Sequence, residues 1–254
     1  MRAWLVIGAA ALLLAAAVAI EAPATLVDQR VQAATAGRVR IAAATGTVWH
    51  GSGALTLMPG GIRTPIAWRI DPMPLLGGEL TGSIEVAGAL RPSEFRVGAE
   101  GDFAVQDLMV TMPAAAVLRA AGIPAMLAAA GGTVALDASN LVRHGDRLDG
   151  RAKLVWQNAT LPGPRAGTRI ALGEVRLDAA GSGEQIPATL ANSGGDVEIA
   201  GNVVLTLRGM PRVDMHARPR AGIGAERSDA VAALLSTVGR SDGAGGFRIV
   251  WPWL

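Results

Sequence analysis

The stretch DVEIAGNVVLTLR, residues 196–208, is the most regular segment of the chain. Its apolar side chains share one parity: Val197, Ile199, Val203, Leu205 and Leu207. Because successive side chains of a β-strand point to opposite faces of a sheet, this alternation predicts a strand with one apolar face. An antiparallel sheet with one face on a core carries this pattern.

The same alternation recurs along much of the chain. Residues 80–90 place Leu80, Ile84, Val86 and Leu90 on one face. Further strand patterns cover residues 47–57, 66–70, 103–112, 133–138, 148–160, 168–177, 186–191 and 247–251. Long amphipathic strands with few helices predict a mainly β fold, either a curved antiparallel sheet or a β-sandwich-like arrangement.

One strand pattern changes phase part-way along. Ile170 and Leu172 share one parity, whereas Val175 and Leu177 share the other, and Gly173 lies between the two pairs. An extra residue in a strand shifts every later side chain to the opposite face. The sequence therefore predicts a β-bulge near Gly173.

Short helical patterns interrupt the strands. They cover residues 21–40, 114–121, 126–130 and 227–238, and the last has Val231, Leu234, Leu235 and Val238 on one side. Strands followed by a helix occur in both halves of the chain, which favours a duplicated unit. We therefore expect a stalk or linker helix at 21–45 and a β-rich domain at 46–254, with halves 46–131 and 132–254.

The N-terminus carries a long apolar run. Residues 4–20 contain no ionisable side chain. A spanning helix needs roughly 17–25 residues and a secretory apolar core about 7–15, so the length favours an uncleaved membrane anchor at 1–20. A cleaved signal peptide stays an alternative, because Ala17, Val18 and Ala19 resemble a small-residue cleavage site. Either segment carries the rest of the chain out of the cytoplasm.

Composition limits the chemistry. The chain has no cysteine, so neither disulfides nor thiol chemistry is available. Its net charge is only +2 although its pI is about 10.2, because nearly all its basic residues are arginine and Lys153 is its one lysine. No polybasic run of the nucleic-acid-binding type is present.

No residue pattern indicates catalysis. His50, His144 and His216 are the only histidines, and no two of them have the spacing of metal ligands. Ser52 stands between two glycines but not in a nucleophile-elbow motif. We expect a protein that is not an enzyme, with no catalytic residue, metal site or cofactor.

The densest basic region lies in the last quarter of the chain and consists of Arg208, Arg212, Arg218, Arg220 and Arg227. It suits contact with acidic lipid headgroups or an acidic partner surface, or it is a solvated loop after a strand.

Several short motifs recur in an order that suggests a family. GTVWHGSG at residues 46–53 is followed by ALTL, then by Trp68, by LLGGEL at 75–80 and by WQNA at 156–159. Together with the apolar N-terminus and the segment 234–249, they resemble protein N of the bacterial type II secretion system. The motif residues of interest are Gly46, Trp49, Gly51, Gly53, Trp68 and Trp156.

The resemblance implies a single-pass subunit of the bacterial inner membrane with its bulk in the periplasm. It would be an accessory, non-enzymatic part of the machine that exports folded proteins across the outer membrane. Expected partners are the membrane and other subunits, namely the inner-membrane protein C and the outer-membrane secretin. The family brings no catalytic residues to transfer.

Two questions stay open at the level of sequence. A periplasmic lipid-binding or lipid-transfer protein is an alternative function, because a curved sheet with one apolar face could hold acyl chains. The motif at 46–53 is interpreted as a tight strand entry, with a partner-binding site as the alternative.

Overall fold

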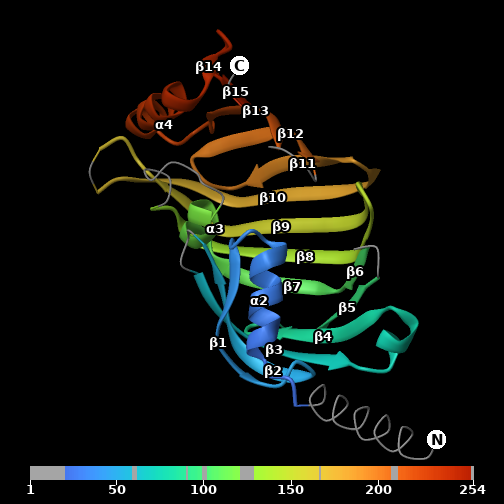
Figure 1. The fold of residues 1–254 in the computed structure, drawn as a ribbon. Coiled ribbons are helices and arrows are strands. Elements are labelled where there is room, and N and C mark those ends of the chain that lie inside the picture. Colours follow the sequence, from blue (N-terminus) through green and yellow to red (C-terminus); the bar gives the residue numbers. More distant parts are fainter. Residues whose placement is uncertain are drawn as a thin grey trace, which may run out of the picture. The chain divides into compact units, whose positions relative to one another are not determined.

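The computed structural model describes residues 21–58, 62–89, 91–98, 102–120, 129–165, 167–206 and 211–252. Strands dominate, as the alternation predicts (Figure 1). The chain divides into two compact units between Ala87 and Gly88. The expected anchor at 1–20 lies outside the described residues. Within the described ranges, no helix is long and apolar enough to cross a membrane.

Unit 1, which ends at Ala87, contains a four-stranded antiparallel sheet in chain order. Ile66, Trp68 and Ile70 are buried, whereas Arg69 between them is exposed, so the predicted alternation sets the core face. The elements are α2 (Thr25–Ala34), β1 (Val39–Gly46), β2 (His50–Leu57), β3 (Ile62–Asp71), the 3₁₀ turn η1 (Pro74–Gly77) and β4 (Leu80–Val86).

Helix α2 lies along β1 and forms part of unit 1. Asp28 Oδ1 accepts a hydrogen bond from Ile41 N at 2.7 Å, and Thr35 Oγ1 accepts one from Val39 N at 3.1 Å. The helix ends where Gly37, at φ +77°, turns the chain back. The region expected as a stalk helix at 21–45 is therefore a shorter helix followed by a strand, and the sheet begins before residue 46.

Unit 2, which begins at Gly88, is a larger antiparallel sheet. Its strands follow the order β5-β6-β8-β9-β10-β11-β12-β13-β15-β14, with β7 also paired to β8. The elements are β5 (Ser93–Val97), β6 (Phe103–Gln106), β7 (Leu108–Pro113), α3 (Ala114–Ala120), β8 (Gly131–His144), β9 (Arg147–Pro162), β10 (Arg169–Gly183), β11 (Gln185–Ser193), β12 (Val197–Thr206), β13 (Arg212–Pro219), α4 (Ala225–Val238), β14 (Arg240–Ser241) and β15 (Phe247–Trp251). Its described strands form one curved series, so the curved-sheet expectation is confirmed and two facing sheets are not observed among them (Figure 1).

Among its described residues, two apolar clusters stabilise unit 2. The first lies under α4, whose Val231, Leu234 and Leu235 are buried on the face that the sequence predicts. The second gathers Ala179, Ile186, Ala188 and Val203 from β10, β11 and β12. The apolar residues on one face of the strands are thus the ones buried in the core.

The predicted bulge is present in β10. The pairing of β10 with β9 shifts on both sides of Gly173, which has φ +75°. Leu172 before the bulge and Val175 after it are both buried in the cluster under α4. The extra residue thus allows even-numbered apolar side chains before the bulge and odd-numbered ones after it to pack in the same core.

The compact units do not coincide with the expected halves. They divide between Ala87 and Gly88, whereas the expected boundary lies near Gly131, which is the first residue of β8. Of the helical piece expected at 126–130, residues 126–128 lie outside the described part of the chain.

Candidate functional site

The motif at 46–53 builds the turn from β1 into β2. Gly46 has φ +92°, and a Cβ placed there would lie 2.5 Å from the backbone oxygen of His50. Thr47 N donates to that same oxygen at 2.9 Å. Glycine at residue 46 is therefore required by both the backbone conformation and the close approach of the returning strand.

The other two motif glycines make room for core side chains. A Cβ at Gly51 would overlap the indole ring of Trp68, and one at Gly53 would lie 2.7 Å from Ile41 Cγ2. Trp68 is buried, and its Nε1 donates to Val48 O at 3.0 Å. This arrangement favours the tight-strand-entry interpretation, since the glycines seat the tryptophan against the turn.

The two remaining motif tryptophans lie in different units. Trp49 is half-buried in the same turn of unit 1, and its oxygen accepts from Ile70 N at 2.7 Å. Trp156 lies on β9 in unit 2, packs on the cluster under α4 and donates from Nε1 to Gly131 O at 2.8 Å. Unit 1 thus brings five of the six motif residues together, and Trp156 has its own place in unit 2.

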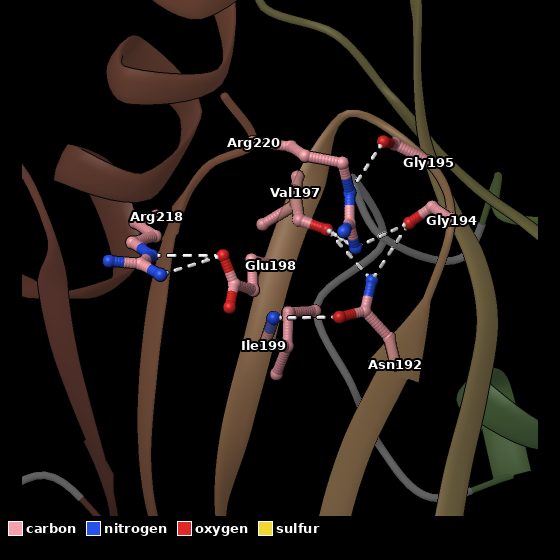
Figure 2. Close-up of polar contacts among 8 residues, drawn as sticks. All are labelled: Asn192, Gly194, Gly195, Val197, Glu198, Ile199, Arg218 and Arg220. Carbon is pink, nitrogen blue, oxygen red and sulfur yellow. Dashed lines mark hydrogen bonds and ion pairs between the residues drawn. The ribbon is translucent and has the colours of Figure 1, made fainter. Parts of the chain in front are cut away.

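A polar network that the sequence does not indicate surrounds the turn between β11 and β12 (Figure 2). Asn192 Nδ2 donates to Leu172 O at 2.6 Å and to Val197 O at 2.8 Å, while its Oδ1 accepts from Ile199 N at 2.7 Å. One amide thereby supplies hydrogen bonds to backbone groups of both β10 and β12. Asn192 has no sequence signal beyond its place before Gly194 and Gly195.

Arg220 approaches the same turn after the end of β13. Its Nε donates to Gly195 O at 3.1 Å and its Nη2 to Gly194 O at 2.9 Å (Figure 2). Asp196, which is only 7% exposed, accepts from Ala171 N at 2.9 Å and from Arg227 Nη1 at 2.8 Å. These contacts tie β10, β13 and α4 to one turn.

The basic region is therefore largely engaged within unit 2. Arg218 pairs with Glu198 at 2.9 Å, Arg220 binds backbone carbonyls and Arg227 pairs with Asp196. Arg208 lies outside the described residues, and Arg212 is exposed on β13. The arrangement favours a structural use of these three arginines over capture of acidic headgroups.

A shallow groove of about 690 Å³ crosses β8 to β12 and is lined by both polar and apolar residues. Its floor carries one row of exposed side chains in direct cross-strand register, and we call this set the polar row: Asp137, Lys153, Asp178, Thr189 and Asn202. Lys153 stands between two aspartates. Charges that alternate across a wide, open face suit hydrogen bonds and ion pairs with another polar surface.

The row continues toward a charged pair on β13 and β15. Asp214 lies opposite Asn202 in register and accepts from Arg248 Nε at 2.8 Å and from Nη2 at 2.6 Å. The Arg248 hydrogen bonds lower the pKa of Asp214, and Asp214 in turn raises the pKa of Arg248. Across the described ranges, no three His, Asp or Glu side chains gather closely enough to hold a metal ion.

Comparison with known proteins identifies the family. The family model for type II secretion system (T2SS) protein N matches residues 37–250, which include strands of both units. The chain belongs to this family. The resemblance drawn from the motifs is thereby confirmed, and the chain is a component of a type II secretion system. No curated protein and no solved structure matches the chain.

Proposed function

We propose that this member of the protein N family is an accessory, non-enzymatic subunit that sits in the bacterial inner membrane by a single N-terminal span and exposes its bulk to the periplasm. It supports export of folded proteins through contacts with other subunits, namely the inner-membrane protein C and the secretin. The observation that carries the proposal is the family match across residues 37–250.

The polar row is the surface that we assign to a partner. Its residues are exposed and belong to five neighbouring strands, so they form a broad face rather than a pocket. Strand pairing at the outer edge of β1 is a poorer route, because Asp28 and Thr35 already accept hydrogen bonds from Ile41 N and Val39 N.

In-cell photocrosslinking tests this assignment. A photoreactive amino acid replaces Thr189 in the polar row, and a matched variant carries it at Arg63, an exposed position of β3 in unit 1. We expect the Thr189 probe to capture a secretion subunit and the Arg63 probe not to. Mass spectrometry of the captured proteins names the partner.

Charge reversal provides the second arm. Lys153→Glu places three carboxylates directly opposite one another in the row and should reduce the Thr189 crosslink; because like charges in register are destabilising by up to about 1 kcal/mol, the crosslink is measured well below the melting temperature of the variant. Equal crosslinking in the variant, or capture of no secretion subunit, would overturn the assignment.

The lipid-handling alternative gains no support from the described residues. None of their large exposed apolar side chains lies on β9 to β13, where an acyl-chain groove in unit 2 would be expected. Recovery of phospholipid without secretion subunits from the same cells would restore that alternative.

A further inference from the structure

Unit 1 carries a cluster of exposed apolar side chains at one end of its sheet. Met73 is 69% exposed and Leu76 is 86% exposed in the loop between β3 and β4, where Leu75 is 41% exposed. Leu26, in the first turn of α2, is 42% exposed. We call these four residues the apolar tip. Large apolar side chains exposed together mark a contact with a partner or a membrane.

The loop that carries the tip is held in a defined conformation. Gly78 N donates to Leu75 O at 3.0 Å and Glu79 N to Pro74 O at 3.1 Å. Asp71 Oδ1 accepts from Met73 N at 3.1 Å, which fixes the start of the loop. The exposure of Leu76 is therefore built into the turn.

The chain enters unit 1 at this same end. Ala24 N donates to Gly46 O at 3.1 Å, and Val48 N donates to Ala22 O at 2.8 Å. The turn that receives these bonds also binds the end of β3, since Ile70 N donates to Trp49 O. Residues 22–24, the β1–β2 turn and the tip loop thus lie at one end of the sheet.

This position sets a distance limit. The apolar run ends at Ile20, four residues before Ala24. Four extended residues span at most about 14 Å. If the run lies in a bilayer, Ala24 must stay within that distance of its surface, and the end of unit 1 that bears the apolar tip is held next to the membrane.

We infer that the apolar tip inserts into the outer surface of the same bilayer and gives unit 1 a second membrane contact. The inference rests on the proposed N-terminal span. The residues flanking the loop, Asp71 and Glu79, are acidic, so attraction to anionic headgroups does not drive the contact. Insertion is apolar and should be insensitive to salt.

The sequence contains no cysteine, which makes the test direct, since each introduced cysteine is the only one in residues 1–254. Three variants, Leu76→Cys, Met58→Cys and Leu13→Cys, carry an environment-sensitive fluorophore. Each is reconstituted in vesicles of phosphatidylethanolamine and phosphatidylglycerol that contain spin-labelled lipid. Met58 is the matched control, because it is 49% exposed and follows the opposite end of β2.

We expect lipid quenching and a blue shift at Leu76→Cys and at Leu13→Cys, and neither at Met58→Cys. Adding Leu75→Asp to the Leu76→Cys chain should abolish lipid quenching at residue 76. Adding the same substitution to the Leu13→Cys chain should leave lipid quenching at residue 13 unchanged. Quenching at 13 without quenching at 76 overturns the inference and leaves the span intact. Absence of lipid quenching at residue 13 in the Leu13→Cys chain overturns the proposed N-terminal span itself. Shielding at 76 only after a secretion subunit is added assigns the tip to a protein and overturns the lipid contact.

Discussion

Gly173 and Gly194 lie close together in unit 2 and share a left-handed backbone, at φ +75° and +72°. A Cβ at Gly173 would also overlap Ser193 O, whereas a Cβ at Gly194 would come no nearer than 4.0 Å to Gly173 Cα. Gly194→Ala should cost about 1–3 kcal/mol from backbone strain. Gly173→Ala should lower the free energy of unfolding further, as measured by chemical denaturation. Equal decreases in the two variants would show that the bulge tolerates a side chain.

Asn192 joins two strands through a single amide. Asn192→Ala should lower the free energy of unfolding by about 1–3 kcal/mol, because backbone groups of Leu172 and Ile199 lose a partner. Asn192→Asp should cost more, since a carboxylate would face two carbonyl oxygens. Asn202→Ala, at an exposed residue of the polar row, is the control and should leave thermal unfolding unchanged.

Trp49 distinguishes the two interpretations of the motif at 46–53. If the motif is a tight strand entry, Trp49→Ala should destabilise the protein by about 1–3 kcal/mol. Normal thermal unfolding together with loss of a crosslinked secretion subunit would instead favour a binding site.

At the scale of elements, α2 covers the outer edge of β1. Asp28→Ala removes the acceptor of Ile41 N and an ion pair to Arg40, so hydrogen exchange at Ile41 should speed up and the uncovered edge should favour oligomers. Asp28→Asn keeps an oxygen acceptor and should protect Ile41 better. Unchanged exchange at Ile41 in Asp28→Ala, with an elution volume equal to that of the unmodified chain, would contradict this role.

Elements with a strong local period could be predicted from the sequence. The strand expected at 196–208, which the structure describes as Val197–Thr206, and the bulge at Gly173 follow from the parity of apolar residues, and the buried face of α4 follows from their helical spacing. The extent of α2 was harder to predict. It is set by Gly37 and by hydrogen bonds to a strand that begins at Val39, and an amphipathic pattern contains no information about that pairing.

The polar sites could not be predicted, because they depend on register. Asp137, Lys153 and Asp178 are 16 and 25 residues apart in sequence but directly opposite one another in the sheet. Arg220 reaches Gly194 only because β12 and β13 pair as they do. The glycines at 46, 51 and 53 could be recognised as a motif in the sequence. The reason for glycine at these positions is a tertiary contact, because they leave room for Trp68, Ile41 and the returning strand.

At the scale of the whole molecule, acid should weaken the fold. Hydrogen bonds from His144, from Arg248 and from the Ala244 and Gly246 amides lower the pKa values of Asp102, Asp214 and Asp242, respectively, from 3.8. Groups with a lowered pKa in the folded state stabilise it above their unfolded pKa, and this stabilisation is lost as the pH falls through the folded pKa.

The melting temperature should therefore fall as the pH drops below about 4. Asp214→Asn should be less stable at neutral pH and should show a shallower acid decline. An acid decline as steep as that of the unmodified chain would exclude Asp214 as a contributor.

The strand order of unit 2 also bears on how the chain reaches its fold. From β8 to β13 each strand pairs with the strand just before it in the sequence. Contact order in this region is low for a β protein, and each pairing closes only a short loop at a small entropic cost. A chain that emerges N-terminus first can add each strand to hairpins already formed, without waiting for distant partners. Helix α4 follows the last of these strands and packs on their core, which β15 then completes with Ile249.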